Sequence, residues 1–220
     1  MGIFSAVIDA NVLYSTYIRG LLLELADIGY FEVKWSQEIL GELERALVRN
    51  FPGTEPEQAE KIRRMQGAFP NAAITGHLHL LGKLAGTDPK DRHVLAAAIR
   101  AQSGALVTFN LKHFPADTFD MYGIELLSPD NFLLDLAEIQ PRLTLDVVCA
   151  RIASHKRPPY TARGYSAAMQ RAQCPNFATF VADHESEIDL LVDDIEMERI
   201  VLERRNDGST PIRVELEDLY

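Results

Sequence analysis

Four acidic side chains in the first half of this chain could together bind a divalent metal ion. Asp9 follows the apolar segment AVI, Glu42 lies in the helical pattern QEILGELERAL, and Asp88 and Asp91 open the segment DPKDRHVLAAAI. Carboxylate oxygens are the ligands that hard cations such as Mg²⁺ and Mn²⁺ prefer. If separate elements bring these residues to one end of a sheet, they make a metal site.

Each of these carboxylates also has an ordinary structural explanation. Pro89 suits the first turn of a helix, so that Asp88 would be its N-cap and Asp91 would face the positive end of the helix dipole. Asp9 could cap a turn, and Glu42 could be a solvated residue at the margin of an apolar stripe. The combination of the four residues, rather than any one of them, therefore supports a metal site.

Polar residues near the predicted strand ends could orient metal ligands or an attacking water. The candidates for this supporting role are Asn11, Ser15, Thr108 and Asn110. His77 and His79 are two residues apart, which places them on different faces of a helix, and we interpret them as structural.

Strand-like and helix-like segments alternate up to residue 127, which predicts a parallel sheet covered by helices on both faces. The predicted strands are 3–9, 31–35, 72–75, 105–109 and 123–127, and the predicted helices are 18–28, 36–48, 56–69 and 89–101, with a helix or turn at 77–84.

After Pro129 the pattern becomes helical, and we expect two domains, 1–135 and 136–220. Helices are predicted within 130–139, 143–152, 160–173 and 176–188. The segment 200–216 predicts a terminal hairpin around an Asn-Asp-Gly turn, although its first arm could equally be the end of a helix.

In sequence order, VIDANVL, SQEILGEL, DPKDRHVLAAAI and TFNLKHFP closely resemble the PIN-domain family, and within it the VapC-like toxin ribonucleases. The resemblance covers residues 1–135. It implies a three-layer α/β/α fold and an endoribonuclease that uses Mg²⁺ or Mn²⁺. Asp9, Glu42 and Asp91 match the three central acidic positions of the family, and Asp88 matches an additional one. The resemblance also implies a cognate antitoxin, which fills the acidic cleft with a basic side chain, and a homodimer.

Two positions depart from the family pattern. Asn110 stands where many members have a fourth carboxylate, and His113 stands where this branch often has aspartate. The sequence therefore leaves open whether the site holds one metal ion or two. It also leaves open whether the protein is instead a non-catalytic PIN-fold scaffold that binds RNA or protein. A phosphatase of the haloacid-dehalogenase type would need an aspartate where this chain has Asn11.

The net charge of -10 is unevenly distributed. Residues 174–220 hold 13 acidic and 4 basic side chains, whereas residues 142–171 hold six basic and one acidic. The basic segment could contact RNA or could be a solvated linker, and the acidic tail could mask it or only aid solubility. The candidate RNA contacts are Arg92, Lys112, Arg157 and Arg163, with Tyr160 and Tyr165 as residues that could stack on bases.

Composition and cysteine content predict a cytoplasmic protein. Hydrophobic residues make up 47% of the chain, and no apolar run approaches the ~20 residues needed to span a membrane. The N-terminus lacks a basic segment of the kind that opens a signal peptide. Cys149 and Cys174 are the two cysteines, and we expect free thiols in a reducing compartment.

Overall fold

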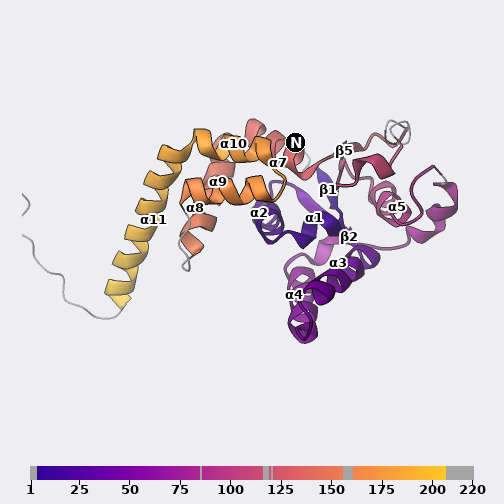
Figure 1. The fold of residues 1–220 in the computed structure, drawn as a ribbon, viewed down its shortest axis with the longest axis horizontal. Helices are drawn as coiled ribbons and strands as arrows, with labels where there is room; N and C mark the ends of the chain where they lie inside the picture. Colours follow the sequence, from indigo (N-terminus) through magenta and orange to yellow (C-terminus); the bar gives the residue numbers. More distant parts are fainter. Residues whose placement is uncertain (1–3, 85, 116–118, 120, 156–160, 207–220) are drawn as a thin grey trace, which may run out of the picture.

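A five-stranded parallel sheet forms the centre of the part of the chain that the computed structural model describes, residues 4–206 except 85, 116–118, 120 and 156–160 (Figure 1). Neighbouring strands pair in the order β3-β2-β1-β4-β5, and every pair is parallel. The strands are β1 (Ser5–Ile8), β2 (Glu32–Ser36), β3 (Ala73–Ile74), β4 (Ala105–Val107) and β5 (Glu125–Leu127). The predicted parallel sheet is confirmed.

Strand β1 lies at the point where the strand order reverses. It pairs with β2 on one side and with β4 on the other, and Ile8 is opposite Val107. In open α/β sheets, a crevice forms at such a reversal, outside the carboxyl ends of the strands. The residues that follow β1 and β4, Asp9 and Thr108, therefore meet at this crevice.

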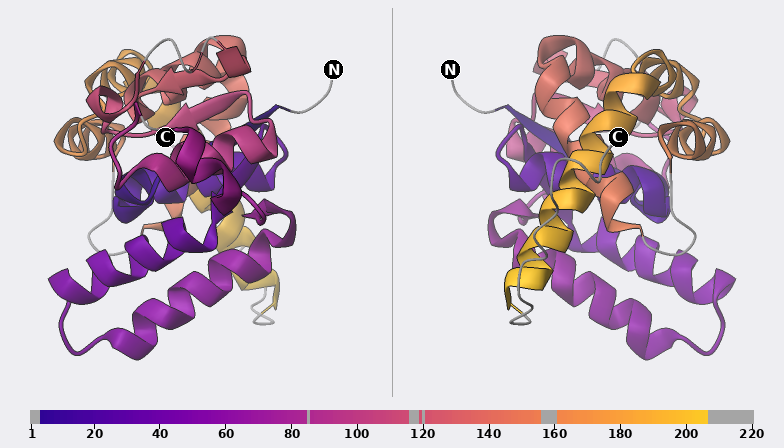
Figure 2. Two further views of the ribbon diagram at one scale, coloured as in Figure 1. Left: turned by 90° about the vertical axis from the view of Figure 1, so that its right-hand side faces the viewer. Right: turned by 90° about the vertical axis from the view of Figure 1, so that its left-hand side faces the viewer.

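Helices cover both faces of the sheet and complete the predicted three-layer fold. Helix α5 packs against β1 to β4, while α1 and α2 lie on the other side of the strands (Figure 1). Helices α3 and α4 form an antiparallel hairpin that projects beyond the sheet (Figure 2). The bounds are α1 (Ala10–Tyr14), α2 (Thr16–Asp27), α3 (Gln37–Asn50), α4 (Glu55–Ala68) and α5 (Arg92–Ala101), with 3-10 turns η1 (Pro70–Ala72), η2 (Leu78–Lys83) and η3 (Leu111–His113).

The predicted start of α5 is wrong by three residues. The helix begins at Arg92 with Asp91 as its N-cap, whereas the sequence predicted a start at Pro89 with Asp88 as the cap. The Oδ1 atom of Asp88 accepts a hydrogen bond from the N–H of Lys90 at 2.9 Å. An aspartate that bonds its own backbone two residues on makes a turn, and this turn delays the helix.

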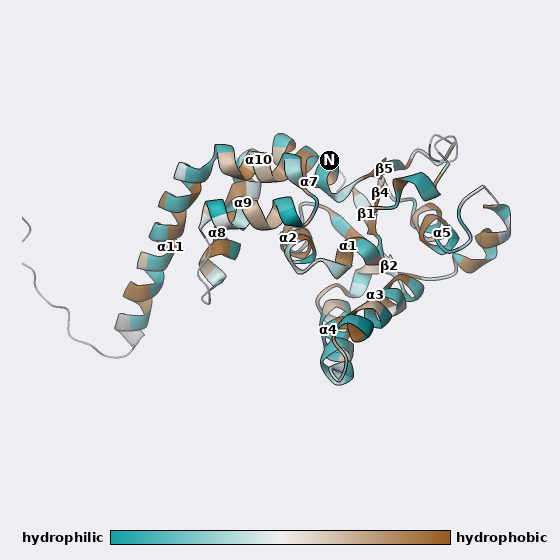
Figure 3. Cartoon of the chain, viewed as in Figure 1, coloured by the Kyte–Doolittle hydropathy of each residue, from teal (hydrophilic) through white to brown (hydrophobic). Residues whose placement is uncertain are grey.

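Five helices follow the sheet within the described residues and confirm the predicted helical extension. They are α7 (Pro129–Ile139), α8 (Pro141–Ser154), α9 (Ala162–Arg171), α10 (Pro175–Asp183) and α11 (Glu185–Asn206). Residues 200–206 belong to α11, so the first arm of the predicted hairpin is helical; residues 207–220 lie outside the described residues. Helix α11 continues because no proline or glycine interrupts it, and apolar and polar residues alternate along it (Figure 3). None of the described helices is long and apolar enough to cross a bilayer.

The helical extension packs onto the sheet through α2 and α7. The Arg151 guanidinium of α8 donates a hydrogen bond to Glu24 of α2 at 2.5 Å, and it lies over Gly20 of the same helix, where a Cβ atom would overlap it. On the α7 side, the rings of Phe31 and Phe132 meet edge to face with centroids 5.2 Å apart. Buried polar and aromatic contacts thus fix the extension to the first domain.

Gly20→Ala should lower the melting temperature, although replacing a helical glycine by alanine normally stabilises a helix. The added methyl group would overlap the Arg151 guanidinium, which is held by Glu24. Overpacking costs about 1–3 kcal/mol, which exceeds the ~1 kcal/mol gained in helix propensity. Thermal melts in the wild-type and Arg151→Ala backgrounds measure the effect, because the loss should vanish when the guanidinium is absent.

Gly67→Ala on α4 is the matched control, since no atom lies within 4 Å of the position that its Cβ would take. This variant should be slightly more stable than wild type. An equal loss for Gly20→Ala in both backgrounds would contradict the proposed contact with Arg151.

Candidate active site

Asp9 lies at the carboxyl end of β1 and is the N-cap of α1. Its side chain is buried, with the residue only 3% exposed. Oδ1 accepts a hydrogen bond from the N–H of Ala10 at 2.6 Å, and Oδ2 accepts one from Asn11 Nδ2 and one from the Thr108 hydroxyl, both at 2.7 Å. Three donors from both sides of the crevice therefore fix the orientation of this carboxylate.

The donors to Asp9 belong to a network that ties the ends of β1 and β4 together. The Thr108 Oγ1 atom accepts hydrogen bonds from Asn11 Nδ2 (3.1 Å) and from the N–H of Asn110 (3.0 Å), while Asn11 Oδ1 accepts one from the N–H of Phe109 (3.2 Å). Asn11 and Thr108 thus contact Asp9 directly, and Asn110 contributes its main chain. Ser15 instead caps α2 by accepting from the N–H of Ile18.

The pKa of Asp9 is raised above its ordinary value of 3.8, chiefly by burial. Hydrogen bonds from Thr108 and Ala10 lower the pKa, and the negative charges of Asp91 and Glu42 raise it further. Both negative charges therefore oppose the ionised form of Asp9. A cation at this site would relieve the repulsion.

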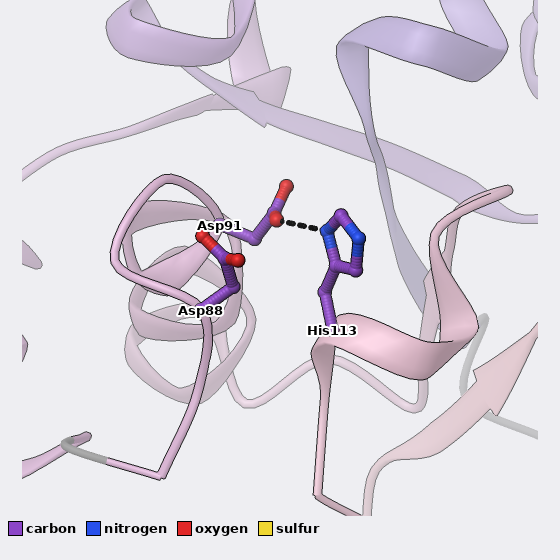
Figure 4. Close-up of side chains that lie close together, drawn as sticks. All are labelled: Asp88, Asp91 and His113. Atoms are coloured by element: carbon purple, nitrogen blue, oxygen red, sulfur yellow. Dashed lines mark hydrogen bonds and ion pairs between the residues drawn. The ribbon is translucent and has the colours of Figure 1, made fainter.

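Asp88, Asp91 and His113 form a group of possible metal ligands (Figure 4). One ligand atom of each residue lies within 4.8 Å of those of the other two, and Asp91 Oδ2 is 2.6 Å from His113 Nδ1. Two carboxylates and an imidazole at this spacing could hold a divalent ion. The cluster forms because the turn before α5 faces η3.

Glu42 approaches the cluster from α3. Its carboxylate lies 3.0 Å from Nε2 of His93 on α5, and its side chain is 39% exposed. Glu42 lines the same surface hollow as Asn11, the partner of Asp9. Of the four predicted carboxylates, the structure places Asp88 and Asp91 at ligand spacing, whereas the group of that spacing found in the described residues does not include Asp9 or Glu42.

Two histidines near the carboxylates were not predicted as part of the site. The sequence signal that could have indicated His113 was its position in the segment NLKHFP. For His93, it was its position two residues after Asp91. The contact of His93 with Glu42 arises from the packing of α3 against α5, for which the sequence carries no direct signal.

The predicted RNA contacts occupy different environments. Lys112 is exposed on η3 next to His113, and Arg163 is exposed in the first turn of α9. Arg92 begins α5, and its Nε atom donates to the carbonyl of Thr87 at 3.1 Å. Arg157 and Tyr160 lie outside the described residues.

The predicted stacking role of Tyr165 is wrong. The residue is only 2% exposed, and its burial raises the pKa of its hydroxyl to about 12. The reason is that α9 turns this face towards the core of the helical extension.

Ion pairs within the chain neutralise part of the predicted basic segment. Arg151 pairs with Glu24, and Arg142 pairs with Asp146 (3.1 Å) and with Glu187 (2.9 Å). Since Glu187 belongs to α11, the beginning of the acidic tail does lie against the basic segment. That this contact limits access of RNA stays a prediction.

Comparisons with known proteins agree with this geometry. Residues 5–112 match the family model described as PIN domain, and residues 129–183 match the one described as VapC50 C-terminal domain. A protein of Mycobacterium tuberculosis (strain ATCC 25618 / H37Rv) named "Putative ribonuclease VapC50" is 43% identical over 89 residues. The match covers 40% of this chain and 52% of that relative, so it spans about half the relative's length. No solved structure matches the chain.

The match to the PIN-domain model spans β1 to β4 and includes Asp9, Glu42, Asp88 and Asp91, and the helices that follow the sheet match the VapC50 C-terminal domain model.

Thr108→Val should destabilise the metal-free protein more at pH 8 than at pH 4. The Thr108 hydroxyl stabilises charged Asp9, so its loss raises the pKa of folded Asp9 still further above 3.8. A carboxyl group with a raised folded pKa loses stability as the pH rises through that pKa. The loss above it should be about 1.5–3 kcal/mol, typical of a hydrogen bond to a charged group. Urea denaturation at the two pH values measures it.

Thr144→Val is the matched control, because Thr144 is fully buried on α8 and its hydroxyl lacks a hydrogen-bond partner among the described residues. Its effect on stability should be the same at both pH values. A Thr108→Val effect that is equally independent of pH would show that the hydroxyl does not stabilise the charge of Asp9.

Proposed function

We propose that this protein is a metal-dependent endoribonuclease and the toxin of a toxin–antitoxin pair. The observations that carry the proposal are the buried Asp9 carboxylate at the strand reversal and the group of Asp88, Asp91 and His113, whose ligand atoms lie within 4.8 Å of one another in a region that matches the PIN-domain model. Crowded like charges destabilise a protein unless a cation offsets them. The relative named as a ribonuclease adds support for the activity.

The donor set fits Mg²⁺ or Mn²⁺, because the candidate ligands are mainly carboxylate oxygens. Asp9, Glu42, Asp88 and Asp91 would hold the metal, and His113 could add a nitrogen ligand. A bound ion would lower the pKa of a water molecule and neutralise charge on the phosphodiester. Thr108 and Asn11 would keep Asp9 in a fixed orientation, and no side-chain nucleophile is required.

The same acidic site would be the place of inhibition. A cognate antitoxin that inserts a basic side chain between Asp9 and Asp91 would replace the metal and block the substrate. We also propose a homodimer and a cytoplasmic location. Cys149 and Cys174 are free and buried, and burial raises their thiol pKa values to about 11 and about 12, which suits a reducing compartment.

Cleavage of labelled single-stranded RNA tests the proposal. Wild type should cleave with Mn²⁺ or Mg²⁺ and not with EDTA. Asp91→Asn should lose at least about a hundredfold in rate, since metal catalysis supplies several kcal/mol. Asp193→Asn on the exposed face of α11 removes the same charge far along the chain and should retain full activity.

Thermal melts of the same variants separate loss of metal binding from loss of folding. In EDTA, Asp91→Asn should be as stable as wild type or more stable, because it removes a charge that raises the pKa of Asp9. Mn²⁺ should stabilise wild type more than the variant. RNA binding without cleavage in Mn²⁺ would instead favour the non-catalytic scaffold.

His113 should give the site a preference for Mn²⁺ over Mg²⁺, because Mg²⁺ is suited by oxygen ligands whereas later divalent ions accept imidazole more readily. His113→Asp should therefore reduce the ratio of Mn²⁺ to Mg²⁺ affinity, measured from the metal dependence of the melting temperature. His79→Asp on η2 changes charge in the same way without touching Asp91, and it should leave the ratio unchanged. An unchanged ratio in His113→Asp would exclude His113 as a ligand.

A further inference from the structure

A hollow of about 450 Å³ joins the two domains beside the carboxylate cluster. Asn11 and Phe109, which belong to the network around Asp9, form one side of it. The C-terminal end of α9 forms the other side. The lining residues that carry the argument are Asn11, Tyr14, Tyr17, Phe109 and Arg171.

Arg171 is the cation of this hollow that remains available to a ligand. It is the last residue of α9 and is exposed. Arg142 and Arg151 of the same basic segment are each paired with carboxylates, whereas none of the ion pairs found in the described part of the chain includes Arg171. An anionic ligand in the hollow would therefore meet an uncommitted guanidinium.

Aromatic side chains line the same hollow. Tyr14, Tyr17 and Phe109 are half-buried there and come from α1, α2 and the turn after β4. Rings of this kind bind unpaired bases by stacking, which contributes about 1–3 kcal/mol per base. A hollow that combines stacking side chains with a free arginine fits a single-stranded nucleic acid better than an acidic peptide.

A second hollow, of about 530 Å³, continues from the first past Asn11 and Tyr14. It reaches Glu42 on α3 and is also lined by Arg45 and Arg49. Cations from α9 and from α3 therefore line two hollows that share Asn11 and Tyr14. A polyanionic strand that follows both hollows would meet positive charge in each of them and would pass Asn11, which is hydrogen-bonded to Asp9.

We propose that the helical C-terminal domain forms one wall of the substrate groove, and that Arg171 binds a phosphate of single-stranded RNA close to the nucleotide at the metal site. The inference rests on the proposed ribonuclease function and deepens it. Tyr17 and Phe109 receive the neighbouring bases, and the strand continues past Tyr14 towards Arg45 and Arg49. Duplex RNA does not fit this arrangement, because its bases are already stacked on one another.

The affinity for fluorescently labelled single-stranded RNA, measured in EDTA to prevent cleavage, tests the groove. Arg171→Ala should weaken binding about tenfold and reduce the salt dependence, the slope of log K against log salt, by about 0.7, the value for one phosphate contact on a single strand. Arg171→Lys should restore most of the affinity. In cleavage with Mn²⁺, Arg171→Ala should raise KM and leave kcat nearly unchanged.

Arg100→Ala is the matched control, because Arg100 is an exposed arginine in the last turn of its helix, α5, and lines neither hollow. It should bind RNA like wild type. Equal weakening by Arg100→Ala and Arg171→Ala would overturn the proposal, since the effect would then be one of overall charge. An Arg171→Ala variant that binds RNA normally but loses affinity for a protein partner would overturn it as well.

The binding assay also separates this inference from the proposed function. If wild type binds RNA in a manner that depends on Arg171 but does not cleave it with any metal, the nuclease proposal fails and the proposed RNA groove is supported. If wild type cleaves RNA and Arg171→Ala behaves like wild type, the proposed RNA groove is wrong and the nuclease proposal is supported. If wild type does not bind single-stranded RNA at all, the proposed RNA groove is wrong.

Discussion

The hydrogen bonds that hold the buried Asp9 carboxylate connect almost every functional feature of this molecule. Burying an ionised carboxylate is costly unless donors surround it. Here the donors come from the first turn of α1 and from Thr108 after β4, so the charge can be buried only if β1 and β4 are neighbours in the sheet. The repulsion from Glu42 and Asp91 is not relieved by these donors. Strand order, the start of α1 and the repulsion acting on Asp9 are therefore consequences of one arrangement, and a change in any of them alters the others.

The sequence was most informative where a pattern is local. Alternating strands and helices, the helix predicted over 36–48 and the spacing of the four carboxylates were all readable from neighbouring residues, and Ser36 caps that helix by accepting a hydrogen bond from the N–H of Ile39. Helix α1 was not predicted, because five residues are too few to show a helical period. The start of α5 was misplaced because proline suits the first turn of a helix, whereas Asp88 forms a turn there. The contact between Glu42 and His93 depends on how two helices pack.

Charge counted along the chain misrepresented the surface of the C-terminal domain for the same reason. A charge count over a segment of sequence treats every arginine alike, but some of these arginines form ion pairs in the folded protein and are not available to a ligand. Arg151 is used to attach the domain, and Arg142 holds α11, while Tyr165 turns inward. Tertiary contacts decide which side chains remain for a ligand, and the end of α9 faces Asn11 and Phe109 across a single hollow. The helical extension thus shares a surface with the hydrogen-bond network around Asp9.

Gly20 sets how closely the Arg151 side chain can approach α2. The absence of a side chain at this position leaves the space that the guanidinium of Arg151 occupies. A larger residue would displace this guanidinium, and the ion pair between Arg151 and Glu24 would have to move with it. A chimera that joins this helical extension to another sheet would therefore keep the ion pair in its present place only if the recipient helix also leaves this space empty.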